Sequence, residues 1–130
     1  MPSSFKELRV WQDAMKFVVS VYRTKNNFPK YELYGLCPQL RRAAVSIPSN
    51  IAEGRGHRSD REFGNFLLHA RGSLLEVQTQ LMIAQELQYI SPGEGERLLE
   101  SSDSIGRGLN ALINSLSEKA ACGKQPTTKD

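Results

Sequence analysis

Apolar residues alternate at steps of four and three along the middle of this chain of 130 residues. The row comprises Phe63, Leu67, Ala70, Leu74, Val77, Leu81, Ala84 and Gln88. Steps of this kind bring side chains to one face of an α-helix. A helix of about 30 residues extends on the order of 45 Å. The spacing therefore predicts one long helix that must bury an apolar face against other helices.

Three further segments have the same helical spacing, and we expect each row to face a common core. The rows are Leu8, Trp11, Met15, Val18 and Tyr22, then Leu36, Leu40, Ala44, Ile47 and Ile51, and finally Leu98, Ser102, Ile105, Leu109, Leu112 and Leu116. A serine followed three residues later by glutamate can cap a helix start, and this pattern begins at Ser4, Ser59 and Ser91.

The predicted helix limits come from proline and glycine. The first helix ends near Asn26, and residues 28–37 form a connection with one short turn. The second helix begins near Pro38 and ends at Gly54 to Gly56. Pro48 lacks the N–H that a helix interior needs, so we expect a kink or a short break there.

The chain has no alternating strand pattern and no internal repeat. Four helices with short connections predict an all-α fold, an antiparallel up-down-up-down four-helix bundle. We expect the bundle domain to span residues 1–121. Residues 122–130 are polar and without periodicity, which predicts a disordered tail.

The composition excludes several classes of protein. Apolar residues make up 39% and charged residues 24%, which argues against general disorder. No apolar run approaches the roughly 18 residues of a membrane span, and charges stand where a signal peptide has its apolar core. Cys37 and Cys122 match no metal or redox spacing, so we expect reduced thiols in a cytoplasmic protein.

The charge is unevenly distributed along the chain. The net charge is +3, but residues 1–75 hold 12 Lys and Arg against 6 Asp and Glu, whereas residues 76–130 hold 5 against 8. Six candidate anion-binding arginines lie in the basic part, namely Arg41, Arg42, Arg55, Arg58, Arg61 and Arg71. Guanidinium groups beside a helix N-terminus can hold phosphate. The alternative is a salt-bridged corner in which Glu53 pairs with an arginine.

The residues suggest neither a catalytic group nor a metal, cofactor or small-molecule site. His57 follows Glu53 by four residues across glycines, and His69 has no carboxylate three residues before it, so the pattern of di-iron bundles is missing. Self-association is one reading of the third helix, which carries extra apolar residues such as Leu68 and Leu75. The other reading is that these residues serve the internal core.

Several sequence blocks resemble the bacterial four-helix-bundle proteins of the 23S ribosomal RNA intervening-sequence family. The resemblance covers roughly residues 5–118. Its main block is Gln39–Gly54, QLRRAAVSIPSNIAEG, and shorter blocks include LxVWQxAM from Leu8, ELYGL from Glu32 and AxGSLxE from Ala70. The family motif residues within the main block are Ser46, Pro48, Ser49, Asn50, Glu53 and Gly54. One departure is His57 between Gly56 and Arg58, where relatives run more directly from glycine into Arg-Ser.

The resemblance implies a homo-oligomer, with ring-shaped pentamers known in the family. It does not imply an enzyme. A more distant likeness is to the basic accessory protein of diversity-generating retroelements, a bundle oligomer that binds nucleic acid. We therefore expect a non-enzymatic cytoplasmic homo-oligomer that binds RNA or DNA backbone through an arginine-rich face. The alternative is a protein-interaction scaffold whose arginines lie in subunit contacts and bind no nucleic acid.

Overall fold

The computed structural model describes residues 4–24 and 26–128, with side chains as far as Lys119. These residues form helices and no strand, so the predicted all-α class is confirmed for them. The helices are η1 (Phe5–Glu7), α1 (Arg9–Arg23), η2 (Lys30–Tyr34), α2 (Leu36–Arg55), α3 (Asp60–Glu86) and α4 (Pro92–Thr128), where η marks a short 3-10 helix. None of the described helices is both long and apolar enough to cross a membrane.

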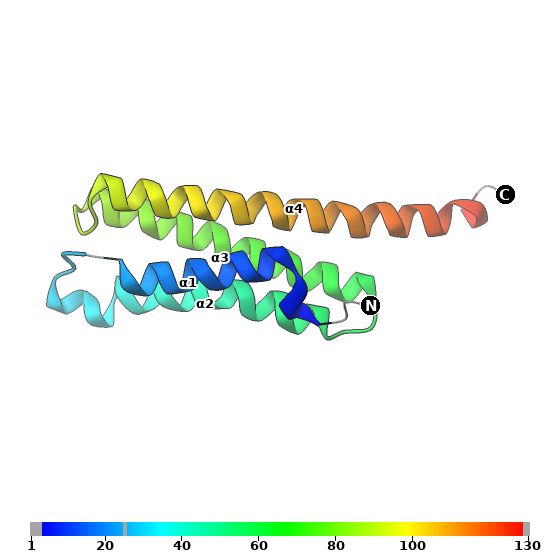
Figure 1. The fold of residues 1–130 in the computed structure, drawn as a ribbon, viewed down its shortest axis with the longest axis horizontal. Helices are drawn as coiled ribbons and strands as arrows, with labels where there is room; N and C mark the ends of the chain where they lie inside the picture. Colours follow the sequence, from blue (N-terminus) through cyan, green and yellow to red (C-terminus); the bar gives the residue numbers. More distant parts are fainter. Residues whose placement is uncertain (1–3, 25, 129–130) are drawn as a thin grey trace.

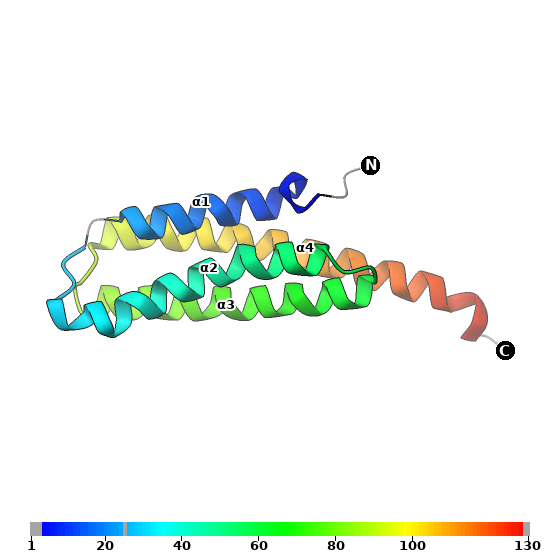
Figure 2. The ribbon, with the colours of Figure 1, turned by 90° about the horizontal axis from the view of Figure 1, so that it is seen from below.

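The four α-helices lie side by side, as Figures 1 and 2 show. Within the described residues α1 packs against α2 and α4, and α3 likewise packs against α2 and α4, so that α1 lies diagonally across the core from α3, and α2 from α4. This is the packing of a four-helix bundle. The pairs α1/α2 and α3/α4 consequently form opposite edges of the molecule.

Helix α4 is longer than expected. Its backbone continues as helix to Thr128, beyond residue 121, where we expected the bundle domain to end. The side chains of residues 120–130, Cys122 among them, lie outside the described part of the chain. The division into a bundle and a disordered tail from residue 122 therefore stays a prediction.

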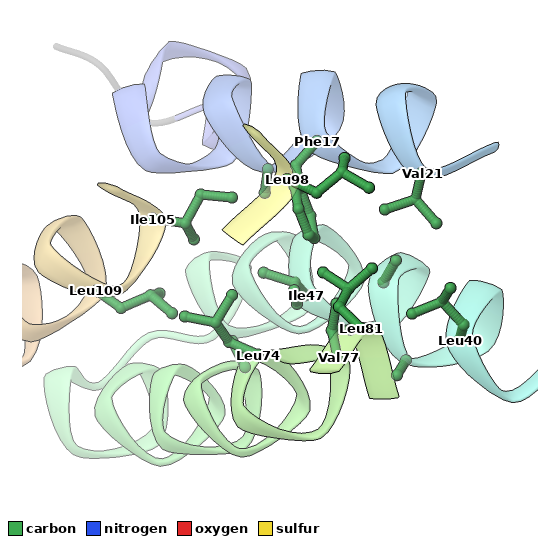
Figure 3. Close-up of a cluster of buried hydrophobic side chains, with 14 of the residues drawn as sticks. Phe17, Val21, Leu40, Ile47, Leu74, Val77, Leu81, Leu98, Ile105 and Leu109 are labelled. Atoms are coloured by element: carbon green, nitrogen blue, oxygen red, sulfur yellow. The ribbon is translucent and has the colours of Figure 1, made fainter. Parts of the chain in front are cut away.

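The core follows the rows predicted for α3 and α4. On α3, Phe63 and the next six members of the row, as far as Ala84, are buried, whereas Gln88 lies after the helix and is exposed. On α4, Leu98, Ser102, Ile105 and Leu109 are buried. Figure 3 shows this cluster, to which α1 adds Phe17 and Val21, and α2 adds Leu40 and Ile47.

The core face predicted for α1 is wrong. The buried residues are Val10, Ala14, Phe17 and Val21. In the predicted row, Leu8, Trp11 and Val18 are half-buried at the margin of the core, whereas Met15 is 41% and Tyr22 is 47% exposed. Both rows have helical spacing, because α1 is apolar on two faces. Helical spacing alone therefore did not determine which face is buried.

Some helix ends also differ from the prediction. Ser4 caps only the 3-10 turn η1, where its Oγ accepts the N–H of Lys6 at 3.1 Å, and α1 begins later, at Arg9. Helix α2 begins before Pro38, because the carboxylate of Glu32 accepts the N–H of Leu36 at 2.8 Å. The helix runs without a break through Pro48, which is buried.

Candidate nucleic-acid interface

The six candidate arginines divide between different parts of α2 and α3. Arg41 and Arg42 lie in the first half of α2, and Arg55 ends that helix. Fourteen residues separate Arg41 from Arg55, which corresponds to about 21 Å along the axis. Arg58 and Arg61 flank the start of α3, so the structure brings them to the same end of the bundle as Arg55 (Figure 2).

The corner between α2 and α3 supplies its own carboxylates. Ser59 caps α3 by accepting the N–H of Glu62 at 3.1 Å, and His57 Nδ1 lies 3.6 Å from Glu62 Oε1. Asp60 pairs with Lys119 of α4 at 3.3 Å. Carboxylates in the first turn already satisfy the positive end of the helix dipole. The corner contains the ion pair of Asp60 with Lys119, as the salt-bridge hypothesis expects. It also keeps Arg58 exposed, as the anion-binding hypothesis expects.

Two of the other candidate arginines contact neighbouring helices. The guanidinium of Arg41 lies 4.7 Å from the centre of the Tyr22 ring on α1, a cation–π contact. Arg71 Nη1 donates to Asn110 Oδ1 of α4 at 2.9 Å. Arg42 is exposed. Both contacts join helices of the bundle, so these two arginines have a packing role whether or not they also meet a ligand.

Half of the family motif is used in packing α2 against α3. Ser46 Oγ and Ser73 Oγ are 2.8 Å apart, and Asn50 Nδ2 donates to Ser46 Oγ at 2.9 Å. A Cβ atom placed on Gly54 would lie 2.5 Å from Cβ of Phe66. The glycine therefore allows the two helices to approach closely at this point.

The three remaining motif residues lie elsewhere on α2. Pro48 and Ser49 line a groove between α1 and α2, and Glu53 is exposed. Thus the motif describes a helix packed on two neighbours.

Three cations on α1 were not among the predicted site residues. Arg9, Lys16 and Arg23 are all exposed and follow one another at steps of seven. That regular spacing is present in the sequence, and it predicts that the three cations lie along one side of the helix. Together α1 and α2 carry six basic and two acidic residues, whereas α3 and α4 as far as Lys119 carry five basic and nine acidic ones. The charge difference along the chain therefore becomes a difference between the helix pair α1/α2 and the helix pair α3/α4.

Two exposed apolar surfaces accompany these charges. The groove between α1 and α2 has a volume of about 410 Å³, and its lining includes Trp11, Met15 and Val45. On α3, Leu68, Leu75 and Met82 recur every seven residues and are 44%, 58% and 52% exposed. Exposed apolar surface that gathers on one face is typical of interaction sites.

A small hydrogen-bonded cluster fixes the other end of the bundle. Tyr89 donates to Glu32 Oε2 at 3.0 Å, and its hydroxyl lies 3.3 Å from that of Tyr31. The hydrogen bond with Tyr31, burial and the nearby Glu32 carboxylate together raise the pKa of Tyr89 well above its ordinary value. Since Glu32 also caps α2, the cluster ties the start of that helix to the turn between α3 and α4.

Among the described side chains, no three His, Cys, Asp or Glu residues gather in a way that could hold a metal ion. Cys37 is a half-buried free thiol.

Comparison with known proteins identifies one family. No curated protein sequence matches this chain. The sequence model described as 23S rRNA-intervening sequence protein matches residues 6–111, which include α1, α2, α3 and most of the described part of α4. The chain therefore belongs to the 23S rRNA-intervening sequence protein family.

Proposed function

We propose that this protein is a non-enzymatic, homo-oligomeric bundle whose function is to present surfaces rather than to catalyse a reaction. The observation that carries the proposal is the apolar surface left exposed on both edges, in the groove beside Trp11 and along Leu68, Leu75 and Met82. Covering such surface with another copy removes it from water. The proposal includes the cytoplasmic location expected from the sequence.

The proposal includes an antiparallel up-down-up-down topology. Contacts across α3 and α4 support it, because they run in opposite order along the two helices. Arg71 bonds Asn110, and farther along α3 Gln78 bonds Ser102, which comes earlier in α4. The turn of residues 56–59 between α2 and α3 is short, and short turns are typical of antiparallel neighbouring helices.

Self-association is tested by light scattering on the purified chain. We expect a mass that is a multiple of 14.6 kDa, and the ring-shaped pentamer implied by the family resemblance corresponds to a multiple of five. A monomeric mass across the concentration range would contradict the proposal.

Arg41 and Arg42 are expected to contribute to that assembly. The double variant Arg41→Ala/Arg42→Ala removes the guanidinium stacked on Tyr22 and its exposed neighbour, so the oligomer should dissociate at higher protein concentration than the wild type does. A matched control, Arg58→Ala/Arg61→Ala, removes the same charge from the corner and should leave the mass unchanged. Equal masses for all three proteins would count against a role of Arg41 and Arg42 in subunit contacts.

Binding of RNA or DNA backbone is the second candidate function. It is favoured by the exposed cations Arg9, Lys16 and Arg23 on α1 and by the exposed Arg58 and Arg61 at the corner. Several copies in one oligomer would strengthen a weak site through avidity.

A single-stranded RNA of mixed sequence provides the test. If each copy contacts about three phosphates, affinity for a single strand should fall about 20-fold between about 50 and 200 mM salt. Arg58→Ala/Arg61→Ala should weaken binding at the lower salt while the oligomer stays intact. The absence of binding at low salt, or an affinity that does not respond to salt, would exclude this candidate and leave the scaffold function.

A further inference from the structure

We infer that the end of the bundle at η2 is a platform on which the bases of a single-stranded nucleic acid stack. The inference rests on the nucleic-acid binding given above as the second candidate function, and it adds the kind of nucleic acid and the residues that meet its bases. Those residues are Tyr31, 71% exposed, and Tyr34, 92% exposed, which together form the tyrosine platform. No other large apolar side chain in the described part of the chain is as exposed, so the bundle itself gains little from either ring.

The two rings of the tyrosine platform leave η2 on the same side. A 3-10 helix has three residues per turn, so side chains three positions apart are eclipsed, and one turn rises about 6 Å. Tyr31 and Tyr34 are three positions apart within this helix, whereas Leu33 leaves it on a different side. Every base has a flat π face, and exposed rings arranged in this way can each stack on one base whatever the sequence.

Hydrogen bonds hold the tyrosine platform in place before a ligand arrives. Glu32 Oε1 accepts the N–H of Leu36 at 2.8 Å, and Glu32 Oε2 accepts the hydroxyl of Tyr89 at 3.0 Å. The hydroxyl of Tyr31 lies 3.3 Å from that of Tyr89. The N–H of Asn27 donates to the carbonyl oxygen of Tyr89 at 2.7 Å, which fixes the chain that leads into η2. An ordered platform loses little conformational freedom on binding, and this favours affinity.

The chain around the tyrosine platform is basic. Residues 14–52 contain six basic residues and one acidic residue, Glu32, whose two carboxylate oxygens both accept hydrogen bonds. Arg23, Lys30 and Arg42 are exposed, at the end of α1, the start of η2 and the first half of α2. The end of α1, η2 and the start of α2 lie together at one end of the bundle (Figures 1 and 2). Phosphates on either side of a stacked base can pair with such cations.

The arrangement favours a single strand over a duplex. Inside a duplex each base is covered on both faces by its neighbours, so a duplex could pair with the cations but could not stack its inner bases on the tyrosines. Exposed carboxylates at the same end, Glu86 and Glu96, belong to α3 and α4. A polyanion is therefore expected on the α1/α2 side of this end.

The test compares three nucleic acids on the full chain. They are a single-stranded RNA of about 12 nucleotides, the same backbone without bases, and the matching duplex. The abasic strand keeps the phosphates and loses the stacking. We expect the wild type to bind the intact strand at least about tenfold more tightly than the abasic one at about 50 mM salt.

Tyr34→Ala should weaken binding of the intact strand about tenfold and leave binding of the abasic strand and the duplex unchanged. Tyr34→Phe keeps the ring and should keep the wild-type affinity. Leu33→Ala is the matched control, because Leu33 is 58% exposed on the same short helix but has no ring, and it should also bind as the wild type does. Circular dichroism and light scattering check the helix content and the mass of each variant.

The salt dependence separates stacking from charge. Lys30→Ala removes a cation beside the platform, so the slope of log affinity against log salt should fall by about 0.7 for a single strand. Tyr34→Ala should weaken binding equally at every salt concentration and leave that slope as in the wild type.

Four results would overturn the inference and leave the second candidate function in place. The first is an affinity for the intact strand that Tyr34→Ala does not change, and the second is equal affinity of the wild type for the intact and abasic strands. The third is a change of oligomer mass in Tyr34→Ala, which would place the ring in a subunit contact. The fourth is a Tyr34→Ala variant that loses binding to vesicles of phosphatidylglycerol but not to RNA. If none of the three nucleic acids binds at low salt, the inference and the second candidate function both fail.

Discussion

Replacing Phe17 with alanine is expected to lower the free energy of unfolding by about 4 kcal/mol. Phe17 is 2% exposed and lies in the cluster with Leu81 and Leu98, so the variant leaves a cavity that the surrounding helices fill only in part (Figure 3). Denaturant unfolding measures the loss through the shift of the midpoint at constant slope.

Met15→Ala is the matched comparison on the same helix. Met15 is 41% exposed, so its truncation within a single bundle should cost less than about 1 kcal/mol. Both variants are measured at the same low protein concentration, so that association of copies contributes equally to the two. Equal losses for Phe17→Ala and Met15→Ala would mean that the row predicted from the sequence faces the core after all.

The second large effect is expected at Gly54. An added Cβ would lie 2.5 Å from Cβ of Phe66 and 3.1 Å from Cδ1 of Phe63. The first of these atoms is fixed to the backbone of α3, so the two helices must move apart. We expect Gly54→Ala to cost about 2 kcal/mol even though alanine favours the helix.

Gly72→Ala should change stability in the opposite direction. Nothing lies within 4 Å of a Cβ at Gly72, which is exposed in the middle of α3. The higher helix propensity of alanine should therefore raise the free energy of unfolding by about 1 kcal/mol. Thermal unfolding of the two variants at the same protein concentration compares them, and a loss of similar size at both glycines would refute the close approach at Gly54.

Helical spacing predicted the fold well where a helix has a single apolar row. On α4, Leu98, Ile105 and Leu109 form the clearest row, and they are buried as predicted. On α1, two rows compete, one through Trp11 and one through Phe17. The choice between them depends on how the other three helices surround α1, and spacing within one helix contains no information about that.

The candidate site was less predictable than the fold. Arg41 and Arg55 are near one another in the sequence, but one helix holds them at opposite ends. The motif residues Ser46 and Asn50 are typical of a polar site, yet Ser46 bonds Ser73, 27 positions away, and Asn50 donates to Ser46. Contacts between helices decide such roles, and a single sequence does not report them.

The separation of charge across the bundle has a consequence for how molecules meet in solution. A basic α1/α2 edge opposite an acidic α3/α4 edge gives the protein an electric dipole across its width, at right angles to the helices. Two approaching copies would be rotated by each other's field before their surfaces touch. Dissolved ions shorten the range of that field, so salt should slow the encounter of copies more than it loosens an assembly already formed.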